Sequence, residues 1–388
     1  MSQSLPIEKL INSRFDDLYL DLKKAQHNLL DKEQPELSQV EIEQSKTARS
    51  LLRVEKQAIQ EKDFNTKSEE SFLSAISGKI NTEAEKQLVK SFQNIDNLHH
   101  KISGFDASIP QLLDMVGMKA ATISTIEPLA SDIPWLLNDL LKMVNQPKYK
   151  RLNNEGEAII VSTMRSGLSF LGVENLIIIL SCLAFKRALP QITDPYPQIK
   201  IRIWEEALAT ALSCKKIASL VGVNPNHAFC LGMLQQLGKI AITKLYFRIF
   251  DTVQRAAIQD TENTQKQQEH SALLKIKPSG NFLNQLIASY GLDISAQLIN
   301  KMSMKRVFIA NAMQEIADNI APSDMSPLAL VVKQGNAYAK YRILTRHKLI
   351  DVQQSKEFIR TLKIPKEHLK MLKAIELHTL NIAVVDTK

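Results

Sequence analysis

Apolar residues recur every three or four positions along nearly the whole chain, and this spacing is the strongest restriction on its fold. The first segment shows it clearly, because one helical face would carry Ile7, Leu10, Ile11, Phe15, Leu18 and Leu22. Strand-like alternation is scarce, and Val384-Val385 is too short to form a strand. The pattern predicts an all-α protein of many helices in a compact arrangement.

Three helices are expected in an N-terminal region that spans residues 1–104. The break at residues 31–35, which ends in Pro35, should end the first helix. A more polar second helix is predicted from about residue 38 to residue 62. A third should begin at Thr82, because Thr82 and Glu85 have the spacing of a capping box.

Gly104 and the turn at residues 108–110 mark the expected start of a central domain, residues 105–320. Within it, the polar stretch 260–269 is interpreted as a loop or an exposed helix surface. Residues 321–388 are expected to form a basic helical C-terminal extension, interrupted by prolines.

Composition favours a folded cytoplasmic protein, with 44% hydrophobic and 23% charged residues among 388. The three cysteines are far apart within apolar patterns, as expected for reduced core thiols: Cys182, Cys214 and Cys230. The N-terminus has no secretory signal pattern. The most apolar run, residues 176–180, is bounded by Glu174 and Lys186 and is much shorter than the roughly 20 residues of a membrane span. We therefore expect a buried helix there and no membrane span.

Positive charge is concentrated near the C-terminus. From Lys301 onward there are 15 Lys/Arg and 8 Asp/Glu, whereas the rest of the chain holds 34 and 33. Residues 340–373 could therefore contact phosphates or an acidic partner. We favour a solvated basic face, because aromatic residues do not interleave with the charges, and nucleic acid is not the expected partner.

Five fragments in the central domain resemble, in order, the motifs of the HDOD family, a hydrolase-related output domain of bacterial signalling proteins. The best-matched segment is 106–250. The fragments are 131–136 ("DPxL"), 141–145 ("LxLxNS"), 158–176 ("AIxxLGxxxL"), 204–211 ("WxHSLxxA") and 228–239 ("AFxAGLLHDIGK").

The resemblance also shows which side chains have changed. Catalytic relatives hold a divalent metal with a histidine and an adjacent His-Asp pair, and the metal polarises a phosphate ester and activates water. Here Glu206, Gln235 and Gln236 stand at those positions. A glutamine amide is a weak neutral ligand, so we expect no metal, no cofactor and no catalysis. Lys239 could contact an anion in the remaining pocket, but we favour a solvated lysine.

The last fragment can also be interpreted without the family. Asn224 followed by Pro225 is a good helix start, since Asn caps and Pro suits the first turn. Gly238 could end that helix, and Gly232 is interpreted as a site of close helix packing.

The resulting hypothesis is a non-catalytic module that acts through protein partners in a signalling pathway. The alternative is a metal-dependent phosphohydrolase for a nucleotide or phospho-ester, with ligands relocated to Glu206, His227, Asp251 and His270.

Overall fold

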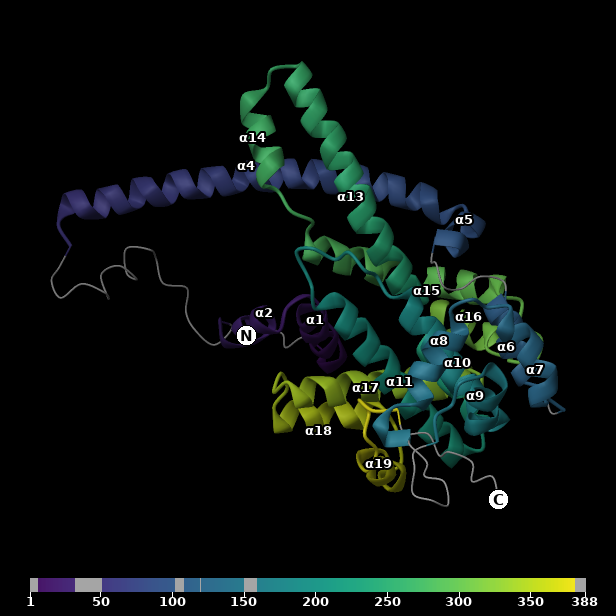
Figure 1. The fold of residues 1–388 in the computed structure, drawn as a ribbon. Coiled ribbons are helices and arrows are strands. Elements are labelled where there is room, and N and C mark those ends of the chain that lie inside the picture. The colour runs from purple at the N-terminus through teal and green to yellow at the C-terminus, as the bar shows by residue number, and fades with distance from the viewer. Residues whose placement is uncertain (1–5, 32–50, 102–107, 119, 150–158, 381–388) are drawn as a thin grey trace.

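The computed structural model describes residues 6–31, 51–101, 108–118, 120–149 and 159–380 (Figure 1). Every regular element in these residues is a helix, so the all-α prediction is confirmed. Predicted features that fall elsewhere, including Gly104 and the start of the second helix, lie outside the described residues.

The helices follow one another with short connections. The N-terminal ones are α1 (Ile7–Leu20), α2 (Leu22–Asp31), α4 (Arg53–Phe92) and α5 (Ile95–Lys101). Next come α6 (Ser108–Val116), α7 (Ile123–Ser131), α8 (Leu136–Val144), the 3-10 turn η1 (Pro147–Tyr149), α9 (Met164–Leu171) and α10 (Val173–Ala188). The centre is formed by α11 (Ile199–Val221), α12 (Pro225–Leu234), α13 (Leu237–Asn263), α14 (Gln267–Lys275) and α15 (Gly280–Lys301). The last are α16 (Ala310–Ala317), α17 (Pro327–Arg346), α18 (Val352–Thr361) and α19 (Lys366–Lys373).

The N-terminal helices differ from the prediction in two ways. Asp21 is extended, with φ −157° and ψ 129°, and divides the first predicted helix into α1 and α2. Thr82 does not start a helix but lies inside the 40-residue helix α4, where its hydroxyl donates to the carbonyl of Gly78 at 2.9 Å. The capping-box prediction was therefore wrong, because a Ser or Thr hydroxyl can also bond to the preceding helical turn.

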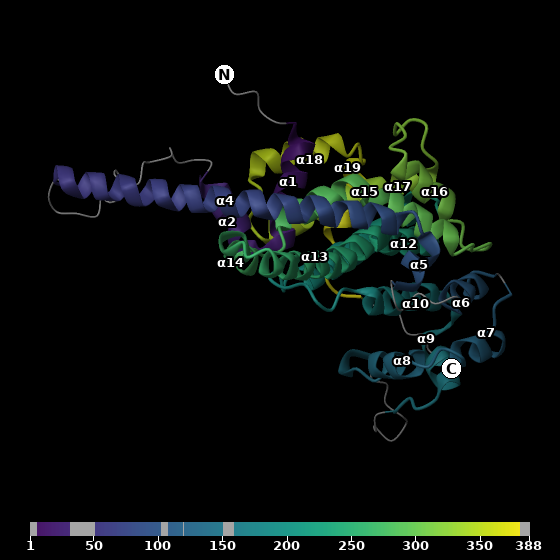
Figure 2. The same ribbon diagram turned by 90° about the horizontal axis from the view of Figure 1, so that it is seen from above.

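Helix α4 is packed along only part of its length. Its buried residues begin at Ile76, on the half that crosses α13 and α14, and Lys275 pairs with Glu69 at 2.7 Å. The first half extends beyond the rest of the described helices (Figures 1 and 2).

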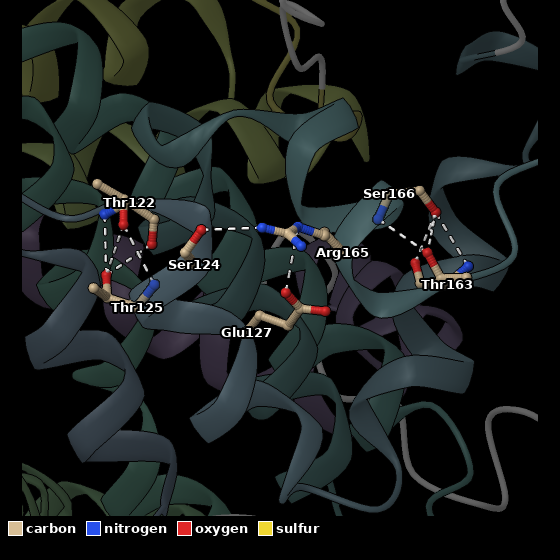
Figure 3. A network of polar contacts seen from close by, with 7 residues as sticks. All are labelled: Thr122, Ser124, Thr125, Glu127, Thr163, Arg165 and Ser166. Carbon is tan, nitrogen blue, oxygen red and sulfur yellow. Dashed lines mark hydrogen bonds and ion pairs between the residues drawn. The ribbon is translucent and has the colours of Figure 1, made fainter.

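Helices α7 and α9 are capped in the same way and tied together (Figure 3). The Thr122 and Thr163 hydroxyls each accept a backbone N–H in the first turn, from Thr125 and Ser166 respectively. Arg165 then reaches from α9 to α7, where it donates to the Ser124 hydroxyl at 3.1 Å and pairs with the Glu127 carboxylate at 3.5 Å.

The central helices pack at unusually short range because glycines lie at their crossings. A Cβ on Gly232 would be 2.9 Å from the Cα of Ala211, which confirms close packing of α12 on α11. Gly238 was predicted to end a helix, and this was wrong, because Gly238 lies in the first turn of α13. A Cβ there would be 2.0 Å from the carbonyl oxygen of Gly291 on α15. Tertiary packing, not helix termination, therefore requires this glycine.

The apolar run 176–180 is buried in α10, as predicted. All three cysteines are free and buried. Within the described ranges, no single helix is long and apolar enough to cross a bilayer, although the bent pair α9–α10, with 111° between its parts, passes the same test of length and composition.

Candidate functional site

A buried ion pair lies where the family-like fragments meet. Glu206 projects from the middle of α11 and its side chain is 1% exposed. Lys239, in the first turn of α13, directs its ammonium to the Glu206 carboxylate and is itself 14% exposed. The interpretation of Lys239 as a solvated lysine was therefore wrong. A cation in a first helical turn opposes the helix dipole, so the carboxylate offsets an otherwise unfavourable position.

A second lysine approaches the same carboxylate from α17. Lys340 is half-buried, and its ammonium donates to the side-chain oxygen of Asn12 at 3.1 Å. Burial lowers the pKa of Lys340 from its ordinary value, an effect that the negative charge of Glu206 opposes. Lys340 thus lies within electrostatic range of the Glu206–Lys239 pair.

Helix α1 covers the two lysines. Phe15 is 3% exposed, and the Lys239 and Lys340 ammonium groups lie 5.8 and 5.3 Å from its ring centroid. Tyr19 is buried beside it, 5.1 Å from the Lys239 ammonium, and its hydroxyl shares a 3.1 Å hydrogen bond with Thr243 of α13. Burial raises the pKa of Tyr19. These ring faces offer the ammonium groups a favourable cation–π environment out of bulk water.

The two glutamines lie at the α12–α13 junction, and both are buried. The Gln235 side-chain amide donates to the carbonyl of Gly232 at 3.2 Å. Its backbone carbonyl accepts from the Ser295 hydroxyl at 2.7 Å, and the same hydroxyl accepts from the Gly238 N–H at 2.8 Å. Gln235 therefore helps to join the helix junction to α15.

The structure does not bring the relocated ligand set together. Glu206 is paired with Lys239, whereas the His227 ring packs against Phe308 with centroids 6.1 Å apart. Asp251 is exposed and pairs with Arg255 of its own helix at 3.1 Å. His270 lies on α14, 4.0 Å from Glu262. Across the described part of the chain, no three His, Cys, Asp or Glu side chains converge as metal ligands.

A family model for the HDOD domain matches residues 105–285. This part of the chain is similar to an HDOD domain. The matched range of the HDOD domain contains Glu206, Gln235, Gln236 and Lys239, whereas α1 and Lys340 come from outside it. The cover and the second lysine of the site are therefore supplied by the flanking parts of the chain.

Solved structures of similar proteins are distant. An HDOD domain protein of unknown function from Geobacter sulfurreducens has 17% identity and a TM-score of 0.44, covering 73% of this chain and 93% of its own. A protein from Shewanella amazonensis, provisionally described as a phosphohydrolase, has 18% identity and a TM-score of 0.39, covering 71% and 97%. The MmoQ response regulator from Methylococcus capsulatus has 17% identity and a TM-score of 0.29, covering 70% and 96%. No curated protein matches the sequence. These likenesses are too distant to carry a function.

Proposed function

We propose that this chain is a non-catalytic regulatory module of a bacterial signalling pathway, acting in the cytoplasm through contacts with protein partners. Its HDOD-like domain, residues 105–320, would be flanked by the helical region 1–104 and the basic extension 321–388. The observation that carries the proposal is the buried pair of Glu206 with Lys239.

The residues at the family's metal positions do not fit a divalent cation. Gln235 and Gln236 offer only neutral amide oxygens, whereas metals of hydrolytic centres are held by imidazole and carboxylate. The single carboxylate, Glu206, already faces an ammonium group, and Lys340 is near it. A dication added there would be repelled by the Lys239 ammonium at short range and also by the charge of Lys340.

The packing of α1 over this ion pair favours a role in transmitting a signal from one part of the chain to another. Helix α1 packs Phe15 and Tyr19 directly over the lysines, and Arg14 donates to the backbone carbonyl of Leu349 at 2.9 Å. The N-terminal helix thus contacts both the HDOD domain and the C-terminal helices. A partner that moved α1 would disturb both at once.

Helix α4 offers the clearest surface for such a partner. On its projecting half, Val54 is 77% exposed and Phe64 is 74% exposed. An exposed apolar side chain on a projecting helix is free to pack into a groove of another protein.

Metal content tests the loss of catalysis. The purified full-length chain is loaded with Mn²⁺, Fe²⁺ or Zn²⁺, dialysed, and assayed by elemental analysis and with a phosphodiester substrate. We expect no stoichiometric metal and no turnover. A matched control restores the family's ligands by Glu206→His, Gln235→His and Gln236→Asp in one chain, and this variant, if folded by circular dichroism, should retain metal. Stoichiometric metal in the wild-type chain, or turnover lost in Glu206→Ala, would overturn the proposal.

Crosslinking in the native cell tests the partner contact. A crosslinked protein should be recovered with the wild-type chain and lost with Phe64→Ser. It should persist with Ile192→Ser, which removes an equally exposed apolar side chain (75%) from a different surface. Recovery that is the same for both variants would exclude α4 as the contact.

A further inference from the structure

A pocket of about 840 Å³ lies on the other side of α11, where α8, α10 and α11 meet residues 378–380. Its apolar lining comes from Met143, Cys182, Leu183 and Leu208. One wall is closed by a hydrogen bond, 2.9 Å long, from the Tyr149 hydroxyl to the Leu380 carbonyl. The volume is in the range of cavities that hold small molecules.

Both tryptophans of the protein line this pocket. Trp204 lies on α11 and packs against Phe185 with ring centroids 6.4 Å apart. Trp135 precedes α8, and the Arg187 guanidinium lies 4.9 Å from its ring centroid. Both indoles are partly exposed, although neighbouring side chains hold them in place. They therefore present fixed aromatic surface to the pocket.

Three cationic side chains surround the same space: Lys142 of α8 and Lys186 and Arg187 of α10. Among the described residues of the lining, the one carboxylate is that of Asp139, 3.8 Å from Arg187. Each lysine alone suits the last turn of its helix, where a cation favours the dipole. Their presence, from two helices, in the lining of a pocket that also holds two indoles indicates a ligand that is both anionic and aromatic.

We propose that this pocket binds a purine nucleotide, with its base against an indole and its phosphates near Lys142, Lys186 and Arg187. A base has a π-face for stacking on tryptophan, and phosphate oxygens accept charge-assisted hydrogen bonds from lysine and arginine. Trp204 and Glu206 are two residues apart on α11, so they point to nearly opposite sides of the helix. The nucleotide pocket is therefore separate from the ion pair, and it remains if the proposed regulatory role fails.

Because these are the only two tryptophans, intrinsic fluorescence reports directly on the pocket. The full-length chain is titrated with ATP, GTP, CTP and UTP, excited at the red edge of indole absorption, and binding is repeated by calorimetry. Saturable quenching by ATP or GTP is expected, with weaker binding of CTP and UTP. Inorganic phosphate and adenosine are titrated separately to test the two halves of the ligand. Each should bind at least roughly tenfold more weakly than ATP, because phosphate lacks the stacking base and adenosine lacks the phosphates.

The variant Lys142→Glu/Lys186→Glu should weaken nucleotide binding at least roughly tenfold, since it reverses two of the three positive charges. Its control is Lys79→Glu/Lys90→Glu, an identical charge change at two exposed lysines of α4. Trp204→Phe, which keeps an aromatic ring, should retain binding with less quenching. The proposal is overturned by an absence of saturable binding of ATP and GTP, by phosphate binding as tightly as ATP, or by equal affinity in the two double variants.

Discussion

Replacing Glu206 by glutamine should destabilise the protein far more than the loss of an ordinary ion pair. The substitution keeps the shape of the side chain but removes the carboxylate charge that faces the Lys239 ammonium at hydrogen-bond distance. Lys239 is then left as a largely buried cation with its paired carboxylate removed, and Lys340 loses the same attraction.

The structure allows the effect to be estimated. Breaking a buried ion pair by removing one partner costs about 3–5 kcal/mol. Lys239 is 14% exposed on a flexible stem, so its ammonium can regain some water. We therefore expect a loss of about 2–4 kcal/mol in the free energy of unfolding. The exposed pair Lys67–Asp63, at 2.8 Å on α4, should contribute far less, because water screens its charges.

Urea unfolding followed by circular dichroism measures both effects as shifts of the midpoint at constant slope. Asp63→Asn is the matched control for Glu206→Gln. The double variant Glu206→Gln/Lys239→Met removes both charges and should recover part of the loss, which gives a coupling of at least about 1 kcal/mol. A Glu206→Gln midpoint close to that of Asp63→Asn, or strictly additive single variants, would refute the assignment of a buried, coupled pair.

Three further predictions concern the surroundings of the site. Gly238→Ala should destabilise the chain by more than about 2 kcal/mol, because the added Cβ overlaps a backbone carbonyl of α15. Gly78→Ala should instead stabilise α4 by up to about 1 kcal/mol, because nothing lies within 4 Å of the added Cβ. A urea midpoint that rises for Gly238→Ala or falls for Gly78→Ala would contradict this packing. Phe15→Ala should cost about 3–5 kcal/mol and speed amide hydrogen exchange throughout α1, and unchanged exchange would show that α1 is not held by this ring. Burial, followed by the charge of Arg202, lowers the pKa of His347 below 6.5, so the unfolded chain takes up the proton first and stability is lost as pH falls below about 6.5. Between pH 8 and 5, the unfolding midpoint should therefore fall less steeply for His347→Gln than for the wild-type chain. Parallel curves for the two proteins would exclude His347 as a source of the pH dependence.

Much of the local structure could be predicted because its causes are local. The Asn224 side chain accepts backbone N–H groups of Asn226 and His227 at 2.9 and 3.1 Å, so the predicted start of α12 is confirmed. The apolar run in α10 is buried, as its composition requires. Local patterns failed where two local structures were compatible with the same residues: Thr82 suits a cap or a helix interior, and Gly238 suits a helix end or a close crossing.

The sequence by itself determined the helical class, the HDOD resemblance and the chemical character of Glu206, Gln235 and Gln236. Only the tertiary structure decided what those side chains contact. Lys239 pairs with Glu206 because α11 and α13 are adjacent, and Lys340 and Phe15 reach the pair from opposite ends of the chain. Such contacts have no sequence period, since they depend on which helix faces are buried together. The same holds for the two indoles and three cations of the nucleotide pocket, which are brought together by packing alone.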